Sequence, residues 1–165
     1  MPDATGLELL AQDLGDAALE TVYFREQATI VIDPRRVRAV LQTLRDSGYT
    51  FLASVHGVDY YPEEPRLGVV YELLDMSRVD RIRVKLRVGT DAPEIDSVTP
   101  EWPTANHQER EVYDMFGVVF RDHPDLRRIL MPEDYEGYPQ RRDFPLGGEP
   151  VIFTRDEAKW LEARE

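Results

Sequence analysis

Cysteine is absent from this chain of 165 residues. Its absence excludes disulfide bonds, and it also removes the thiolate ligands that hold iron–sulfur clusters. We therefore expect that the chain carries no such cluster and does not itself transfer electrons through one.

Basic side chains and long apolar runs are also scarce. Lysine and arginine together number 20 against 32 aspartates and glutamates, which gives a formal net charge of −12. This balance argues against a nucleic-acid surface and against adhesion to anionic lipids. No window approaches the roughly 20 consecutive apolar residues that span a bilayer, and residues 1–16 are acidic, unlike a signal or transit peptide. Membrane association is therefore expected only through partners.

The common catalytic motifs are missing as well. The sequence contains no GxSxG elbow, no glycine-rich nucleotide fingerprint and no cysteine nucleophile. Carboxylate pairs such as Glu63–Glu64 and Glu133–Asp134 are adjacent in sequence, which is more typical of solvated turns than of a general acid and its base. We expect no catalytic residue in this chain.

Two helices are expected early in the chain, whose length fits one domain with one core plus an extension. Apolar residues recur at helical spacing before Gly15, and again between the capping pair Asp33–Pro34 and Gly48. The two stripes consist of Leu7, Leu10, Ala11 and Leu14, followed by Val37, Val40, Leu41 and Leu44.

Strands are expected around these helices. Residues 22–25 and 28–32 are extended segments that form either a hairpin or one bulged strand. Three longer strands are predicted at Tyr49–Val58, Leu67–Leu74 and Arg81–Val88. Because a sheet with one buried face is usually antiparallel, we predict an α+β fold with a mostly antiparallel sheet and helices on one face. We assign residues 1–120 to this domain and residues 121–165 to an extended C-terminal arm.

The third of these strands alternates without error between apolar and basic residues. Ile82, Val84, Leu86 and Val88 would face the core, and Arg81, Arg83, Lys85 and Arg87 would face away from it. Two interpretations stay open for the basic face. It is either a solvated surface paired with carboxylates such as Asp80 and Glu72, or a surface that meets an acidic partner.

A third helix is predicted from Asn106 to Gly117, with an apolar stripe of Val112, Met115 and Phe116. Asn106 would cap its start, and Glu109 would reach back in a capping box. Gly117 would end it, so that Val119 begins the next extended piece. Arg110 and Asp114, four residues apart, could form an exposed ion pair.

The segment after this helix is rich in helix breakers. Residues 121–153 contain five prolines and three glycines together with many large apolar groups, so the segment must lie against its own domain or another protein. We predict that residues 122–153 are extended, wrapped on a partner and largely disordered when the chain is alone. A short helix capped by Thr154 and Glu157, carrying Trp160 and Leu161, is expected to follow.

Histidines offer one candidate metal site. His107, Glu111 and Asp114 could point the same way from a helix, but one histidine with two carboxylates is a weak signal, and we expect no metal. His123, before Pro124, is expected to hydrogen-bond its own turn or a partner. His56, in a strand, is expected to be a satisfied core or edge residue.

The run EREVYDMFGVVFRDHPDLRRILMPEDYEGYPQRRDFPL, residues 109–146, resembles the signature of a known family. It is similar to the thirty-kilodalton subunit, designated C, of proton-pumping NADH:quinone oxidoreductase (respiratory complex I) and of related quinone- and hydrogenase-type complexes. The sequence differs from the commonest pattern at Tyr113 and Tyr135, where tryptophan is frequent, and at Gln140, where leucine is usual. These differences affect single contacts only.

The resemblance implies a non-catalytic structural subunit of the peripheral arm of complex I. Members of the family dock on the large, hydrogenase-like quinone-site subunit, designated D, near the cluster-bearing subunit, designated B, on the cytoplasmic side of the membrane. This chain would hold no cofactor, while flavin and iron–sulfur clusters belong to its partners, which pass electrons from NADH to quinone and translocate protons. The alternatives are a homologous subunit of a photosynthetic or hydrogenase-type complex, and a freestanding small enzyme.

The residues expected to contact partners lie on the third helix and the arm. Four arginines of the arm are either interface anchors or members of a solvated mixed-charge segment, namely Arg127, Arg128, Arg141 and Arg142. The expected interface comprises Glu109, Arg110, Glu111, Asp114, His123, Leu126, Arg127, Arg128, Ile129, Leu130, Tyr138, Arg141, Arg142 and Phe144.

Overall fold

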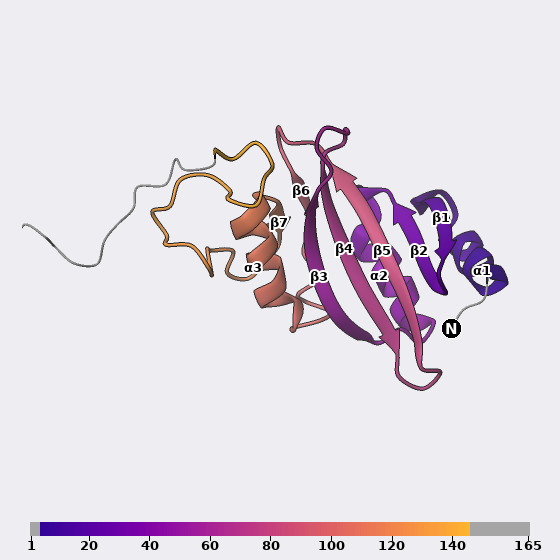
Figure 1. Ribbon diagram of the computed structural model, residues 1–165. Coiled ribbons are helices and arrows are strands. Elements are labelled where there is room, and N and C mark those ends of the chain that lie inside the picture. Colours follow the sequence, from indigo (N-terminus) through magenta and orange to yellow (C-terminus); the bar gives the residue numbers. More distant parts are fainter. Residues whose placement is uncertain (1–3, 146–165) are drawn as a thin grey trace, which may run out of the picture.

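The computed structural model describes residues 4–145 (Figure 1). Three α-helices, two 3-10 turns and seven strands follow one another within this range. In chain order they are α1 (Ala4–Leu14), η1 (Gly15–Ala17), β1 (Ala18–Phe24), β2 (Gln27–Ile32), η2 (Pro34–Arg36), α2 (Val37–Asp46), β3 (Phe51–Asp59), β4 (Leu67–Asp75), β5 (Asp80–Val88), β6 (Glu94–Asp96), α3 (Ala105–Phe116) and β7 (Val119–Arg121).

Five strands form one sheet in the order β1-β2-β5-β4-β3. Every neighbouring pair is antiparallel except β2 and β5, which run parallel. The segments around residues 22–32 therefore form a hairpin, with an irregularity between Ala18 and Glu20. The predicted α+β fold with a mostly antiparallel sheet is confirmed. A second, two-stranded sheet pairs β6 with β7 in parallel.

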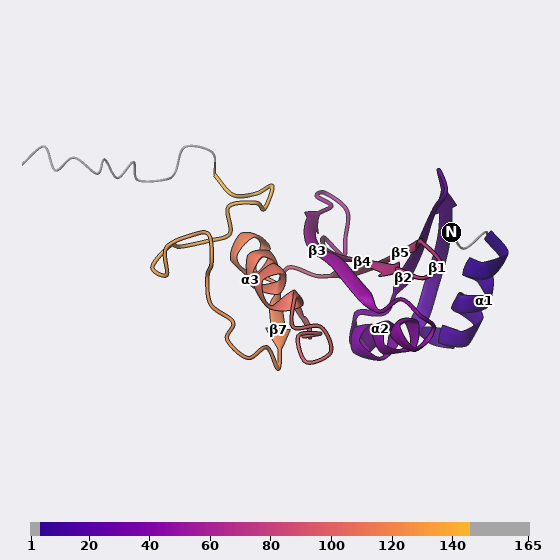
Figure 2. The same cartoon turned by 90° about the horizontal axis from the view of Figure 1, so that it is seen from below.

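The hydrophobic core lies on one face of the large sheet, as the alternation of β5 predicts. Ile82, Val84 and Leu86 are fully buried there, whereas the intervening Arg83 and Lys85 are only partly covered. Helix α2 packs its buried stripe on this face, and α1 lies on the same side beside β1 (Figure 2). Each large apolar side chain removed from water in this way contributes about 1.5–3 kcal/mol.

The start of α2 follows the capping rule. The carboxylate of Asp33 accepts a hydrogen bond of 2.9 Å from the backbone N–H of Arg35, and Pro34 occupies the first position of the turn. A proline costs nothing there, because that N–H has no partner within the helix. The first turn is 3-10 and continues into α2 at Val37.

Helix α3 packs against the edge strand β3, and Gly57 permits the close approach. A Cβ atom at Gly57 would lie 2.2 Å from the ring of Phe116. The helix ends as predicted, because Gly117 takes a left-handed φ of 74° and Val119 begins β7. Its start differs from the prediction: α3 begins at Ala105, and Thr104 precedes it without a capping side-chain bond.

The predicted capping box of Glu109 is wrong. The carboxylate points inward and accepts hydrogen bonds from Ser97 Oγ (2.6 Å), the N–H of Val98 (2.8 Å) and Thr99 Oγ1 (3.1 Å). Three donors on the loop after β6 satisfy the buried carboxylate better than one N–H at the helix start would. Glu109 therefore joins α3 to that loop.

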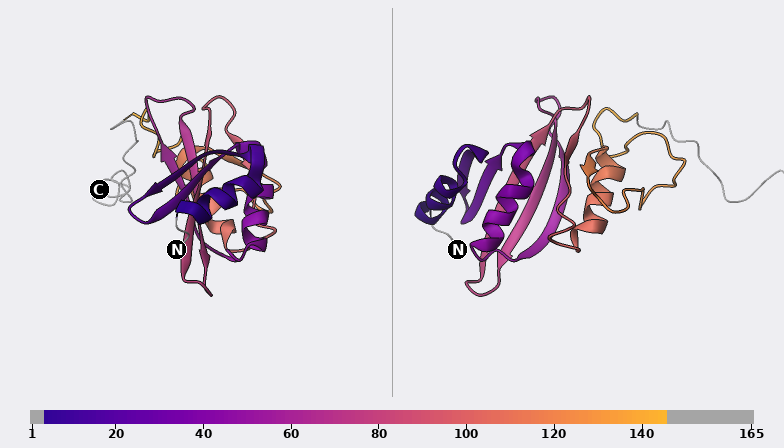
Figure 3. Two further views of the ribbon diagram at one scale, coloured as in Figure 1. Left: turned by 90° about the vertical axis from the view of Figure 1, so that its right-hand side faces the viewer. Right: turned by 180° about the vertical axis from the view of Figure 1, so that it is seen from behind.

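Residues 122–145 are the part of the predicted arm that the structure describes, and from here on we call them the arm. They contain no helix or strand and lie beside α3, at the opposite end of the molecule from α1 (Figure 3). The prediction of an irregular arm is confirmed for this part. Its hydrogen bonds are made to its own domain, so the prediction that residues 122–145 are largely disordered when the chain is alone needs correction. That the segment also wraps on a partner stays a prediction. Residues 146–153 and the predicted terminal helix lie outside the described residues.

Candidate partner interface on α3 and the arm

Asp114 anchors the arm from inside α3. Its side chain is fully buried, and Oδ2 accepts the backbone N–H groups of Ile129 (3.0 Å), Leu130 (2.7 Å) and Met131 (2.8 Å). Burial alone would raise the pKa of this carboxyl, but the N–H of Met131, the guanidinium of Arg128 and the other two N–H groups outweigh it. The pKa of Asp114 is therefore lowered, and the carboxylate is charged at neutral pH.

Arg128 is the matching group on the arm. Its Nη1 lies 2.6 Å from Asp114 Oδ1, and its Nη2 donates to the carbonyl of Gly137 at 2.9 Å. The guanidinium also lies 5.5 Å from the ring centre of Tyr138 and 5.7 Å from that of Tyr135. Because its side chain is only 12% exposed, Arg128 organises the arm from within and presents little surface to a partner.

A second attachment lies at the C-terminal end of α3. Tyr138 packs over Gly117, where a Cβ atom would lie 2.5 Å from the tyrosine ring. Arg141 stacks on the same ring at 4.6 Å and donates a 2.7 Å hydrogen bond from Nε to the carbonyl of Phe116. This bond uses a carbonyl that the helix end leaves without an internal partner. Phe144 stacks on Tyr135 with ring centres 6.2 Å apart.

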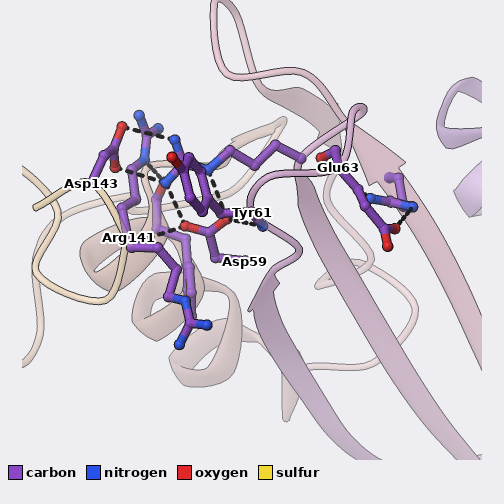
Figure 4. Close-up of polar contacts among 9 residues, drawn as sticks. Asp59, Tyr61, Glu63, Arg141 and Asp143 are labelled. Carbon is purple, nitrogen blue, oxygen red and sulfur yellow. Dashed lines mark hydrogen bonds and ion pairs between the residues drawn. The ribbon is translucent and has the colours of Figure 1, made fainter.

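The third attachment joins the arm to the loop before β4. Arg66 donates to Asp59 through Nε (2.7 Å) and Nη2 (2.6 Å), and to Asp143 through Nη1 and Nη2 (both 2.8 Å). Figure 4 shows Asp59 and Asp143 converging at this point beside Tyr61. Hydrogen bonds from Arg66 hold the pKa of Asp59 and that of Asp143 below their usual values.

The turn that begins the arm is fixed by His123. Its Nδ1 accepts from the N–H of Asp125 at 3.1 Å, so its Nε2 carries the proton and donates to the carbonyl of Asn106 at 3.2 Å. The prediction that this histidine bonds its own turn is confirmed. Burial first, and then the charge of Arg110, lower its pKa and favour the neutral ring. Glu109 lies nearby, 3.9 Å from Nε2.

Arg110 does not form the predicted ion pair with Asp114. Its Nε and Nη2 donate to the carbonyls of Arg127 and Arg128, each at 3.1 Å. The pair is not formed because Asp114 faces the interior, where it already has four donors. Arg110 and Asp114 thus each hold the arm in place through separate hydrogen bonds.

The outer side of α3 and the arm carries two exposed apolar side chains. Leu130 is 60% exposed and Ile129 37% exposed, although the backbones of both are fixed by Asp114. Leu130 borders a groove of about 330 Å³ between β3 and α3. The groove is lined by Val55, His56, Gly57, Glu111, Val112, Met115, Phe116, Leu130 and Gln140.

The expected interface residues thus separate into two groups. Leu126 packs against the core, and eight residues make contacts inside the chain, namely Glu109, Arg110, Asp114, His123, Arg128, Tyr138, Arg141 and Phe144. Glu111, Arg127, Ile129, Leu130 and Arg142 are exposed. Arg127 pairs with Asp125, whereas the side chain of Arg142 makes no hydrogen bond or ion pair within residues 4–145.

Three residues of the third attachment were not expected from the sequence. They are Asp59, Arg66 and Asp143, and the last two are 77 positions apart. No local pattern marks them, because an ion pair between distant segments leaves no periodic signal. His56, by contrast, lies in the edge strand β3 as expected and is exposed.

The three residues considered as metal ligands do not come together. Of the three possible ligands His107, Glu111 and Asp114, the first two are exposed and the third is buried. Across residues 4–145 no three histidine or carboxylate side chains gather to hold a metal ion. No helix in the same range is both long and apolar enough to cross a bilayer.

The fold and this surface define a class of small α+β domains that carry an irregular arm fastened to their last helix. Residues 30–150 match the family described as the respiratory-chain NADH dehydrogenase, 30 Kd subunit. This chain belongs to that family.

Curated relatives support the same assignment. The chain is 45% identical over 157 residues to the C subunit of the NADH-quinone oxidoreductase of Roseiflexus sp. (strain RS-1), covering 93% of this chain and 90% of the relative. It is 42% identical over 140 residues to the protein of the same name from Citrifermentans bemidjiense, covering 84% of this chain and 87% of the relative.

Two solved structures share the fold. One is described as "Nqo5 of the trypsin-resistant fragment (1-134)"; it has a TM-score of 0.67 and 32% identity, and the match covers 76% of this chain and all of that one. The other comes from a membrane-bound sulfane sulfur reductase, an archaeal respiratory membrane complex, with a TM-score of 0.73, 26% identity and 86% of each chain covered.

Proposed function

We propose that this chain is a structural subunit of an NADH:quinone oxidoreductase and itself contributes no catalytic residue. Family membership and relatives named as the C subunit of that enzyme support this role. In this proposal NADH oxidation, quinone reduction and proton translocation occur on other subunits, which hold the flavin and the iron–sulfur clusters. The chain lies on the cytoplasmic side of the membrane and reaches it only through those partners.

The docking surface in this proposal is the outer side of α3 and the arm. It contacts the large quinone-site subunit, close to the subunit that bears the clusters. The observation that carries the proposal is the exposed pair Ile129 and Leu130, whose backbones are held rigid by Asp114. A preorganised apolar anchor beside a groove loses little conformational entropy on binding, which favours affinity.

Arg127 and Arg142 are the rim of this surface in our proposal. Both are exposed, and Arg142 has its guanidinium available, so they suit carboxylates or carbonyls of a partner. Arg128 and Arg141 act differently, because their donors are already engaged inside the chain. They position the surface and are not expected to contact the partner through those donors.

We further propose that residues 1–120 form a domain that folds without residues 121–165. The trypsin-resistant fragment of the related structure supports this division, because it matches 76% of the present chain. The large sheet, with two helices on the core face, supplies the buried apolar surface that an independent domain needs.

Replacing Leu130 by aspartate tests the docking surface. The variant should retain the thermal stability of the parent chain, because Leu130 is largely exposed, yet co-purify with the other subunits from membranes about tenfold less well. The matched control is Met76→Asp, which changes a similarly exposed apolar residue in the β4–β5 turn. If Leu130→Asp assembles as well as Met76→Asp, the proposed surface is wrong.

One observation favours a second candidate, a homologous subunit of a related respiratory assembly. The fold is shared with a chain of the sulfane sulfur reductase complex. The higher identity to NADH-quinone oxidoreductase subunits favours the first candidate. Identifying the co-purified subunits by mass spectrometry separates the two candidates. A subunit that oxidises NADH is expected only if the chain belongs to an NADH:quinone oxidoreductase.

A further inference from the structure

The large sheet has a second face that the helices leave uncovered. Across β1, β2, β5 and β4 the register aligns Val22, Thr29, Arg83 and Glu72, and their side chains point away from the core. Helices α1, α2 and α3 all pack toward the core side, where Leu7, Leu41 and Val112 are buried. In the described part of the chain, no helix lies over the opposite face (Figure 2).

This open face contains a depression of about 250 Å³. Val22, Thr29 and Val31 supply an uncharged row along β1 and β2, and Lys85 and Arg87 supply a basic row along β5. The complete lining is Glu20, Val22, Thr29, Val31, Tyr60, Lys85 and Arg87. We call these seven residues the basic sheet surface.

The cations of the basic sheet surface are weakly engaged. Lys85 makes no hydrogen bond or ion pair within residues 4–145. Arg87 lies 4.3 Å above the ring centre of Tyr60, and its one carboxylate partner, Glu63, is 3.3 Å away and 72% exposed. Arg83, by contrast, is paired with Glu72 on the neighbouring strand. Two cations and one carboxylate, Glu20, therefore line the depression.

The charge of the rest of the chain restricts what this surface binds. The net charge of −12 repels extended polyanions such as nucleic acid or an anionic bilayer. At physiological salt, screening limits that repulsion to roughly 8 Å, so a local basic surface still attracts a short acidic segment. The uncharged row formed by Val22, Thr29 and Val31 would contact apolar groups of the same segment.

We propose that the basic sheet surface is a second docking site, which binds an acidic, partly apolar segment of another protein subunit. One carboxylate of that segment pairs with Lys85 and another with Arg87, while an apolar side chain fills the depression beside Val22. This site is separate from the α3 and arm surface and goes beyond the function proposed above. Of the two interpretations of the basic face of β5, contact with an acidic partner then holds for Lys85 and Arg87. Pairing with a carboxylate of the same chain holds for Arg83.

The chain allows a direct chemical test, because Lys85 and Lys159 are its only two lysines. A carbodiimide joins a lysine amine to a carboxylate in contact with it. Treating the assembled complex should therefore link Lys85 to an aspartate or glutamate of another subunit, which peptide mass spectrometry identifies. Acetylation of Lys85 should also be about tenfold slower in the complex than in the isolated full chain.

Variants extend the test. Lys85→Glu should lower recovery of the complex about fivefold, and Lys85→Arg should preserve recovery while abolishing the cross-link, since a guanidinium does not react. Arg35→Glu is the matched control, because it makes the same charge change on the exposed turn η2. Cross-links from Lys85 confined to Glu20 or Glu72 of its own chain, or to a second copy, would overturn the proposal. Equal acetylation in both states, or normal assembly of Lys85→Glu, would do so as well.

The outcome is independent of the Leu130→Asp experiment. A chain that assembles despite Leu130→Asp but not with Lys85→Glu would support the basic sheet surface while refuting the α3 surface. The reverse result would refute the basic sheet surface alone.

Discussion

Asp114 on α3 and Arg128 on the arm meet at 2.6 Å in an interior that excludes water from the aspartate entirely. The same carboxylate also accepts three consecutive backbone N–H groups from residues 129–131. A buried charge is tolerated only when it is paired and hydrogen-bonded, and this one has four donors. The conformation of the arm therefore depends on a residue that no partner can reach.

Replacing Asp114 by asparagine should destabilise the chain by about 3 kcal/mol, because Arg128 then lacks its counter-charge and an amide offers one acceptor instead of two. Urea unfolding of the full chain measures the change. Glu111→Gln, an exposed position on the same helix, is the control and should change stability by less than about 0.5 kcal/mol. Similar values for the two variants would show that Asp114 does not anchor the arm.

Removing the arm should leave a domain that still unfolds cooperatively. A chain ending at Arg121 keeps the whole five-stranded sheet and α1 to α3, but leaves Asp114 without its donors from the arm. Asp114→Asn should therefore cost less than about 1 kcal/mol in the shortened chain, far less than in the full chain. A non-cooperative thermal melt of the shortened chain would contradict the independent domain, and an undiminished cost would contradict the proposed coupling.

The two carboxylates that share Arg66 should differ in importance. Asp59 is 3% exposed and Asp143 is 55% exposed. Asp59→Asn should cost about 2–4 kcal/mol, as breaking a buried pair does. Asp143→Asn should cost less than about 1 kcal/mol because water replaces the lost bonds. Denaturant unfolding gives both values, and hydrogen exchange at residues 140–145 should accelerate in both variants. An equal loss of unfolding free energy in the two variants would mean that exposure does not determine how much each carboxylate contributes.

Acid should loosen the start of the arm through His123. Burial lowers its folded-state pKa below the ordinary value near 6.5. The unfolded chain then binds the proton first, so the stability that the neutral ring contributes is complete above pH 6.5 and is lost as pH falls below it. Protonation also places a hydrogen on Nδ1, which currently accepts from Asp125. Asp125, Arg110 and Glu109 are the charged groups near the ring.

Glu109 contributes with the opposite sign. Burial raises its folded-state pKa, so it costs stability as pH rises above the unfolded value near 4.5. The comparison must therefore be made between variants: His123→Gln should flatten the fall in stability below pH 6.5, and His107→Gln, at an exposed site, should not. Parallel pH profiles for all three chains would show that His123 does not titrate with unfolding.

The sheet was accessible from the sequence because its signals are periodic. The alternation of residues 81–88 indicated which side of β5 is buried, and Asp33–Pro34 and Gly117 marked helix ends through local backbone requirements. Such signals depend on neighbours within a few positions, so one sequence suffices to read them.

The inner contacts of the candidate site were not accessible for the opposite reason. Glu109 and Asp114 look like ordinary exposed helix acids, because burial of a carboxylate depends on donors supplied by other segments, 10 to 17 positions away. Arg66 finds Asp143 across 77 positions. The family resemblance indicated which stretch carries the family signature, but not that Asp114, Arg128 and Arg141 make their contacts inside the chain.

The three attachments of the arm have a consequence for genetics. Arm residues 128–131 are fixed on Asp114, Arg141 on Phe116 and Asp143 on Arg66. These inner contacts therefore determine the shape of the arm's outer surface. A substitution at the fully buried Asp114 should therefore impair assembly as a substitution at Ile129 or Leu130 does, although no partner can touch it. A genetic screen restricted to exposed positions would miss such substitutions.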